Sequence, residues 1–177
     1  TDFIDNSAGV DTSDHEVNIK IALGDVVKRG DMTLKQRDAL LAGMTDQVAA
    51  LVLRHNYQQT QALSVAQSYG SARLDEQQRM MRALERVNLL NRQIEFLPPD
   101  EELAQRQSAH VGLTRPELSV LLAYSKNVTY AQLLDSDLPD DPKLEMDLLR
   151  YFPDPIREKY PDAITRHRLR REIIATV

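Results

Sequence analysis

The sequence of 177 residues contains no cysteine and only six glycines. The absence of cysteine excludes disulfide bonds and thiolate metal sites, and it fits a cytoplasmic protein. No two glycines lie close enough in the sequence to form a dinucleotide-binding loop or a Walker-type phosphate loop. This sequence therefore does not carry a nucleotide-binding motif of its own.

Long apolar runs and an excess of positive charge are also missing. No run approaches the roughly 18 apolar residues of a membrane span, and no signal peptide precedes Thr1, so we expect no membrane partner. The net charge of −5 argues against non-specific binding to nucleic acid. The basic residues at 166–171 alternate with apolar ones and lack interleaved aromatics, which favours a solvated helix face over a nucleic-acid site.

What is present is typical of a globular protein with one core, or one domain and an appendage. Charged residues make up 28% and hydrophobic residues 42% of the chain. The chain starts without a methionine and stops inside an apolar, still-periodic segment that no glycine or proline terminates. We therefore expect it to be a piece of a longer protein.

The first twenty residues combine two kinds of local signal. Residues 6–11 are small and polar around Gly9, which suits a loop that approaches a ligand. Ser13 followed by Glu16 forms a capping-box pattern, which predicts a helix from Asp14 to about residue 28. Amides at a helix start attract anions, so a substrate carboxylate could bind beside Ser13. The alternative is an ordinary capped turn without any ligand.

Further helix signals continue through the chain, and the predicted fold class is all-α. Thr33 with Gln36 opens a short helix, and Thr45 caps a long one to about residue 69. A helix over residues 74–96 follows, and the two long helices are predicted to form an antiparallel hairpin. Later segments include a helix that Thr114 and Glu117 begin, and a last one from Asp162 to the chain end. The N-terminal segment before the first helix is predicted to be extended.

The charged cluster of residues 11–16 contains side chains that could bind a metal ion. Its carboxylates and imidazole are ligands that hard and borderline ions accept. However, adjacent helical residues point in different directions, and no histidine pair at i, i+4 can share an ion, so no metal is expected. His55 lies on the apolar stripe of the long helix and is interpreted as a core or rim residue. No general acid or base can be assigned.

Three runs of residues resemble the large bacterial NAD-specific glutamate dehydrogenases: 1–20, 112–126 and 167–176. The resemblance implies a parent enzyme that uses NAD to convert L-glutamate to 2-oxoglutarate and ammonia. It implies that residues 1–30 end the catalytic domain and that residues 31–177 belong to a helical C-terminal domain, truncated at its end. The family's catalytic lysine and aspartate and its NAD-binding glycines lie upstream, so this fragment holds no catalytic residue and should be inactive alone.

The shorter glutamate dehydrogenases carry an Asn-Ala-Gly-Gly-Val run followed by a serine before a helix. Matching on Gly9 and Val10, the resemblance implies that Ser13 binds the substrate's side-chain carboxylate. It also implies that Val10 lines the glutamate pocket and that Asn6 lies near the nicotinamide end of the cofactor. Ionisable residues replace uncharged ones of the shorter enzymes nearby, so the pocket is expected to differ there: Asp11, Asp14 and His15.

A competing hypothesis is a helical structural, oligomerisation or regulatory module without catalysis. The many capped amphipathic helices support it, and it can hold for the helical region even within an enzyme. We expect the full-length protein to be a homo-oligomer. A nucleic-acid-binding module is a third hypothesis, and it would require salt-sensitive binding.

Overall fold

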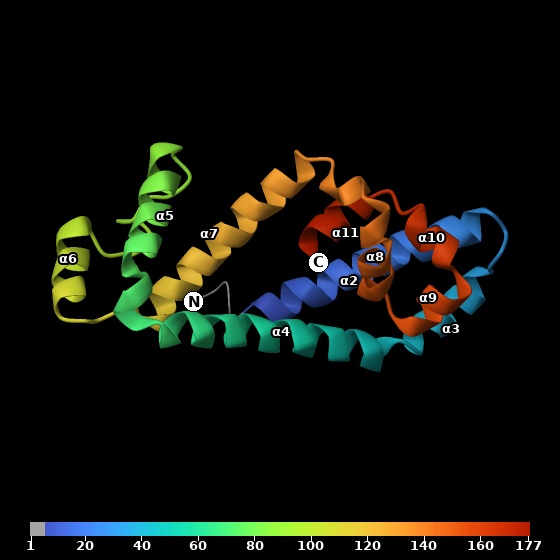
Figure 1. Cartoon of the computed structure of the whole chain (residues 1–177). Helices are drawn as coiled ribbons and strands as arrows, with labels where there is room; N and C mark the ends of the chain where they lie inside the picture. Colours follow the sequence, from blue (N-terminus) through green and yellow to red (C-terminus); the bar gives the residue numbers. More distant parts are fainter. Residues whose placement is uncertain (1–5) are drawn as a thin grey trace. The chain divides into compact units, whose positions relative to one another are not determined.

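The computed structural model describes residues 6–177, and this part of the chain is all-α, without a strand, as predicted (Figure 1). The α-helices, in chain order, are α2 (Ser7–Lys28), α3 (Leu34–Ala42), α4 (Thr45–Ser68), α5 (Leu74–Arg86), α6 (Asp100–Ser108), α7 (Arg115–Leu134), α8 (Glu145–Tyr151), α9 (Asp154–Lys159), α10 (Pro161–Thr165) and α11 (Arg170–Thr176). Short 3₁₀ turns are η1 (Gly70–Arg73), η2 (Leu138–Asp140) and η3 (Pro142–Leu144).

The described chain divides into two compact units. One combines Ser7–His55 with Thr129–Val177, and we call it the α2 unit. The other contains Asn56–Val128, and we call it the α5 unit. The chain passes from one unit to the other after His55 and again after Val128. Neither position coincides with the domain boundary predicted after residue 30, and that boundary stays a prediction about the parent protein.

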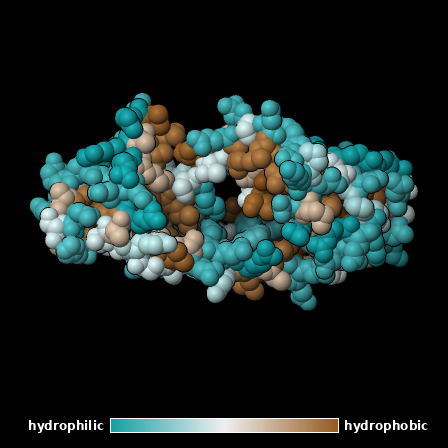
Figure 2. All heavy atoms as spheres, viewed as in Figure 1, coloured by the Kyte–Doolittle hydropathy of each residue, from teal (hydrophilic) through white to brown (hydrophobic). Residues whose placement is uncertain are grey.

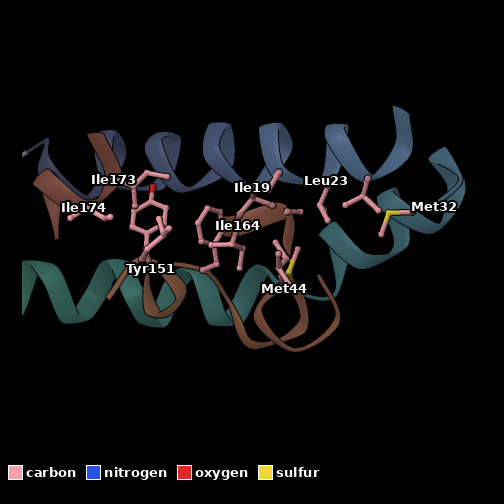
Figure 3. Packing of buried hydrophobic residues seen from close by; sticks show 14 residues of the cluster. Ile19, Leu23, Met32, Met44, Tyr151, Ile164, Ile173 and Ile174 are labelled. Atoms are coloured by element: carbon pink, nitrogen blue, oxygen red, sulfur yellow. The ribbon is translucent and has the colours of Figure 1, made fainter. Parts of the chain in front are cut away.

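The core of the α2 unit forms where α2 packs against the short helices near the C-terminus (Figure 3). Leu148, Ile156 and Ile164 are completely buried there, and Phe152 is 1% exposed. Burying side chains of this size supplies roughly 1.5–3 kcal/mol each. The buried face of α2 is not purely apolar, because two polar side chains lie among its apolar ones: His15, Asn18, Ile19, Ala22, Leu23 and Val26.

The α5 unit has its own core, built on the strongly amphipathic helix α5. Leu74, Met81 and Leu84 form its buried face. They pack with Leu103 of α6 and Leu118 of α7 in one hydrophobic cluster. The apolar spacing of α5 at i, i+7 and i+10 places these side chains on one side of the helix.

Several helix ends agree with the sequence signals. Thr33 and Gln36 form a complete capping box at the start of α3. Gly30 adopts a left-handed φ of 83° just after α2. Its amide bonds the Val27 carbonyl, and the Asp31 amide bonds the Val26 carbonyl, which is a Schellman motif. Local hydrogen bonding is sufficient to set these ends.

The predicted start of the first helix at Asp14 is wrong, because α2 begins at Ser7. Residues 1–5, where the rest of the predicted extended segment falls, lie outside the described residues. Gly9 costs the helix only about 1 kcal/mol. Extending the helix brings Asp11 against His55, and this tertiary contact has no counterpart in local propensity. Ser13 therefore does not cap the helix.

Other predicted helices also end differently. α5 stops at Arg86, ten residues before the predicted end at 96, because Asn88 takes a left-handed φ of 56°. The antiparallel hairpin of the two long helices stays a prediction. Thr45 is the first residue of α4, and its hydroxyl donates to the Ala42 carbonyl. The predicted last helix is divided into α10 and α11 around His167.

Candidate functional site

The candidate site lies on the polar part of the buried face of α2, within the α2 unit. Asp11, Asp14, His15 and Asn18 occupy positions i, i+3, i+4 and i+7, so helical geometry gathers them on one side. Glu16 faces elsewhere, is exposed and pairs with Lys20. We call Asp11, Asp14, His15 and Asn18, together with His55 of α4 and Tyr151 of α8, the polar cluster.

Tyr151 is the centre of the hydrogen bonds in the polar cluster. Its hydroxyl donates to Asp14 Oδ2 at 2.6 Å and accepts a hydrogen bond from Asn18 Nδ2 at 2.8 Å. The Asn18 amide also donates to Asp14 Oδ1 at 3.3 Å. Figure 3 shows the Tyr151 ring reaching from α8 to α2. These contacts tie the C-terminal helices to α2.

The acidity of Tyr151 is suppressed by its surroundings. Burial raises the pKa of the phenol, and its hydrogen bond to Asp14 raises it further. Both effects act because a phenolate would be poorly solvated and would be repelled by the carboxylate. Tyr151 therefore stays a protonated hydrogen-bond donor at neutral pH.

His15 is the most buried polar residue of the polar cluster. Its side chain is fully buried, and its ring stacks on Tyr151 with a centroid separation of 4.4 Å. Burial lowers the pKa of His15, with nearby Asp11 opposing and His55 adding to that shift. A neutral imidazole is therefore favoured.

Asp11 connects His15 to His55. The Nδ1 atom of His55 lies 2.9 Å from Asp11 Oδ2, within hydrogen-bond distance. The Nε2 atom of His15 lies 3.7 Å from Asp11 Oδ1, which is too long for a hydrogen bond. The potential ligand atoms of these side chains all lie within 4.8 Å of one another. Two imidazoles and a carboxylate are a donor set that suits divalent transition metals.

His167 adds a second buried imidazole on the other side of Asn18. Its Nε2 lies 3.1 Å from the Asn18 carbonyl, and its Nδ1 accepts the Leu169 amide at 3.1 Å. Because Nδ1 accepts, the proton must reside on Nε2, so the ring is neutral in this arrangement. His167 thus holds α2 against the segment between α10 and α11.

The burial of His167 leads to a pH-dependent stability. Burial, the largest effect, lowers its pKa below the unfolded value of 6.5, and nearby Arg168 lowers it further. The Asn18 carbonyl and Glu172 act in the opposite direction but do not cancel this shift. Its contribution to stability is therefore complete above pH 6.5. As the pH falls through the folded-state pKa, the contribution is lost at up to about 1.4 kcal/mol per pH unit.

Urea unfolding of the chain and of His167→Gln between about pH 7 and about pH 5 measures this loss. The variant should show a shallower decline of the unfolding free energy with falling pH, since glutamine binds no proton. His110→Asn, an exposed histidine of the α5 unit replaced at its left-handed φ of 58°, serves as the control. If the unfolding free energy declined equally steeply with falling pH in the original chain and in His167→Gln, protonation of His167 would not be the cause of the decline.

The residues predicted to bind substrate and cofactor lie outside the polar cluster. Ser13 is exposed in the interior of α2, and Val10 is 62% exposed near its start. Asn6 lies in the turn immediately before α2. Sequence reasoning identified Asp11, Asp14 and His15 as ionisable neighbours. It missed their partners, because those partners come from distant helices: His55 and Tyr151.

Comparison with known proteins places the chain in a family context. Residues 1–66 match the family model described as "Bacterial NAD-glutamate dehydrogenase, catalytic domain", which extends past residue 30. Residues 110–177 match the family model described as "Glutamate dehydrogenase, C-terminal". The polar cluster joins both matched segments, since His55 falls in the first and Tyr151 in the second.

Similar curated proteins are each named NAD-specific glutamate dehydrogenase. The protein from Pseudomonas aeruginosa is 58% identical and that from Halomonas elongata 51% identical, each over 99% of this chain. The protein from Mycobacterium tuberculosis is 41% identical over 100% of the chain. In every case the chain spans 11% of the relative's length. Among the described residues, no helix has the length and apolar character needed to cross a membrane.

Proposed function

The chain belongs to the family of large NAD-specific glutamate dehydrogenases, and we propose that it forms part of an enzyme that converts L-glutamate, NAD and water to 2-oxoglutarate, ammonia and NADH. The relatives' shared name and the two family matches support this proposal. The phosphate groups of NAD would bind to a part of the parent outside this sequence, because no glycine-rich phosphate loop occurs here. The parent enzyme would act in the cytoplasm.

The outward face of α2 is the part of this chain that would contribute to the glutamate pocket. Val10, Ser13 and Val17 share this face at positions i, i+3 and i+7, opposite the buried face. All are exposed, with Val10 at 62% and Val17 at 49%. This exposed stripe of small and apolar residues in the catalytic-domain match is the observation on which the proposal rests.

In this proposal, Ser13 donates its hydroxyl to the side-chain carboxylate of glutamate. Val10 lines the pocket, and Asn6 lies near the nicotinamide end of the cofactor. The free amides of α2 belong to its first turn, residues 7–10, so helix amides at Ser13 do not assist. The hydroxyl is thus the recognition group that Ser13 offers.

The overall proposal is tested by measuring glutamate-dependent formation of NADH. We expect the full-length parent enzyme to be active and the 177-residue chain alone to be inactive. Activity in the isolated chain would overturn the assignment of catalysis to the rest of the parent. A well-folded parent enzyme without activity would overturn the proposed reaction.

The residue-level role is tested in the parent enzyme by Ser13→Asp. A lost hydrogen bond to a charged group costs about 1.5–3 kcal/mol, and the new carboxylate would also repel the substrate. We therefore expect KM for glutamate to rise about ten- to a hundredfold, with KM for NAD nearly unchanged. Thermal stability should stay within about a few degrees, because position 13 is exposed and helical.

Thr12→Asp is the matched control, since it adds the same charge to a neighbouring exposed position that faces another direction. It should leave KM for glutamate close to that of the parent enzyme. Equal kinetics for Ser13→Asp and Thr12→Asp would show that Ser13 does not contact substrate.

A second proposal concerns assembly of the parent as a homo-oligomer. The segment after α5 exposes large apolar side chains, visible around the end of α5 in Figure 2. Their exposed fractions are 61% for Val87, 54% for Leu89, 70% for Ile94 and 90% for Phe96. Such clustering is typical of an interaction surface, and we propose a second copy of the parent as its partner.

Sedimentation equilibrium of the parent protein and of its Ile94→Lys variant tests this proposal. The parent should sediment as an oligomer and the variant should associate more weakly, whereas a monomeric parent would contradict the proposal.

We propose no membrane or nucleic-acid partner for this segment. If the chain bound duplex or single-stranded nucleic acid, and this binding weakened with added salt, the absence of a nucleic-acid partner would be contradicted.

A further inference from the structure

We propose that Asp11, His15 and His55 bind one divalent transition-metal ion of the zinc class. The donor atoms come from two turns of α2 and from α4, and all lie within 4.8 Å of one another. The inference does not depend on the proposed dehydrogenase reaction, because it rests only on contacts inside the α2 unit. It also differs from the expectation from sequence, in which no metal was assigned.

The strongest observation is the state of the His15 ring. The side chain is fully buried, yet neither of its ring nitrogens has a hydrogen-bond partner among the described residues. Leaving a buried donor or acceptor unpaired destabilises the folded protein. A metal ion bound at Nε2 would give that nitrogen a partner, and Nε2 already faces Asp11.

The spacing of the donors is close to what a tetrahedral ion requires. Ligands at about 2.0–2.1 Å from a zinc ion lie about 3.3 Å from one another. The separation of His55 Nδ1 and Asp11 Oδ2 is 2.9 Å, and that of His15 Nε2 and Asp11 Oδ1 is 3.7 Å. These two values, each measured to a different oxygen of Asp11, bracket the required spacing, and the separation of the two histidine donors lies within 4.8 Å, so rotation of the side chains would bring the donors onto one ion.

The surrounding residues hold the ligands in place. The His15 ring lies between Tyr151, at a centroid separation of 4.4 Å, and His55, at 5.7 Å, and is nearly parallel to both. Tyr151 is fixed in turn by Asp14 and Asn18. These ring contacts fix the orientation of the His15 imidazole and so reduce the cost of ordering it as a ligand.

Exposure explains where the remaining ligand would come from. The side chain of Asp11 is 22% exposed and that of His55 is 36% exposed. Water can therefore reach this edge of the site and supply a fourth ligand, as in three-ligand protein zinc sites. Two imidazole donors favour zinc, cobalt or nickel over magnesium or calcium, which prefer oxygen ligands.

The site is tested in the full-length parent protein by equilibrium dialysis against Zn²⁺ and by visible absorption after loading with Co²⁺. We compare the original protein with His15→Phe, which keeps an aromatic ring in the stack, and with His55→Gln, which changes a half-exposed position. Each variant should bind one ion fewer per chain, or bind that ion at least about a hundredfold more weakly. The corresponding Co²⁺ absorption should disappear.

His110→Asn is the matched control, because His110 is exposed and lies in the α5 unit. It should bind the same number of ions as the original protein, and circular dichroism should confirm that every variant is folded. Identical Zn²⁺ stoichiometry and affinity in the original protein and His55→Gln would overturn the proposal. Binding of Mg²⁺ in preference to Zn²⁺ at this site would also overturn it.

Discussion

Replacing Gly112 by alanine is expected to lower the free energy of unfolding by about 3 kcal/mol or more. A Cβ atom at this position would lie 2.6 Å from the carbonyl carbon and 2.7 Å from the carbonyl oxygen of Gly70. Both are backbone atoms, so no flexible side chain can move aside. Gly112 lies between α6 and α7, and Gly70 follows α4, so the substitution would force these connections apart.

Other glycines of the chain provide controls for this prediction. A Cβ at Gly24 meets nothing within 4 Å and lies inside α2, so Gly24→Ala should stabilise the chain by about 0.5–1 kcal/mol. Gly70→Ala also finds open space, but its φ of 52° carries a strain of about 1 kcal/mol. Chemical denaturation of the variants should therefore rank Gly112→Ala as the least stable. A loss at Gly112 no larger than at Gly70 would contradict the clash.

The contrast between these glycines shows what sequence reasoning can and cannot predict. Gly30 closely follows the predicted helix end at about residue 28, and its left-handed φ of 83° is typical of a glycine just past a helix. Gly112 carries no local signal of its close approach to Gly70, because that contact joins distant parts of the chain. Hydrogen bonds at a helix end depend on residues close by in the sequence, whereas the close approach of two backbone segments depends on residues far apart in it.

The helix ends follow the same division. Thr33 and Gln36 satisfy one another within one turn, so the capping box was predictable. The end of α5 was missed because Asn88 stops the helix by adopting a left-handed conformation that asparagine tolerates but does not require. The start of α2 was missed because Ser13 and Glu16 imitate a capping box. Tertiary contacts of the extended helix, such as those of Asp11 with His55 and of Asp14 with Tyr151, override that local signal.

The polar cluster was only half predictable for the same reason. The positions of Asp11, Asp14 and His15 on one helix suggested a concentration of ionisable groups. Their partners His55 and Tyr151 are far away in the sequence, and His55 was interpreted as a core or rim residue. It lies at a half-exposed rim, as that interpretation allows, but it also contacts Asp11.

The largest single loss of stability is expected on removing the guanidinium of Arg106. This side chain is 18% exposed and makes paired hydrogen bonds of 2.8 and 2.9 Å to the carboxylate of Glu117. It also bonds Glu102 through Nε at 3.0 Å and Nη2 at 2.6 Å. Glu117, which is 12% exposed, accepts the Thr114 amide at 2.6 Å at the start of α7. One ion pair thus connects α6 to the cap of α7.

The charge of Glu117 depends on this pairing. Burial alone would raise its pKa, but hydrogen bonds from Arg106 and Thr114 outweigh burial and leave the pKa lowered. Arg106→Met would leave a largely buried carboxylate with only the Thr114 contact. Breaking a buried pair in this way costs about 3–5 kcal/mol, because the remaining charge is no longer compensated.

A double substitution separates the loss of the Arg106–Glu117 contact from the cost of leaving the Glu117 carboxylate charged and unpaired. Glutamine at position 117 can still accept the Thr114 amide but carries no charge, so Arg106→Met with Glu117→Gln should recover about 1–3 kcal/mol of the loss. Arg150→Met is the control, since Arg150 is 66% exposed and its pair with Asp147, at 3.6 Å, should contribute no more than about 1 kcal/mol. Urea unfolding measures all four proteins. If Arg106→Met costs no more than Arg150→Met, the pair is not a buried one in solution, and the cap of α7 forms without help from α6.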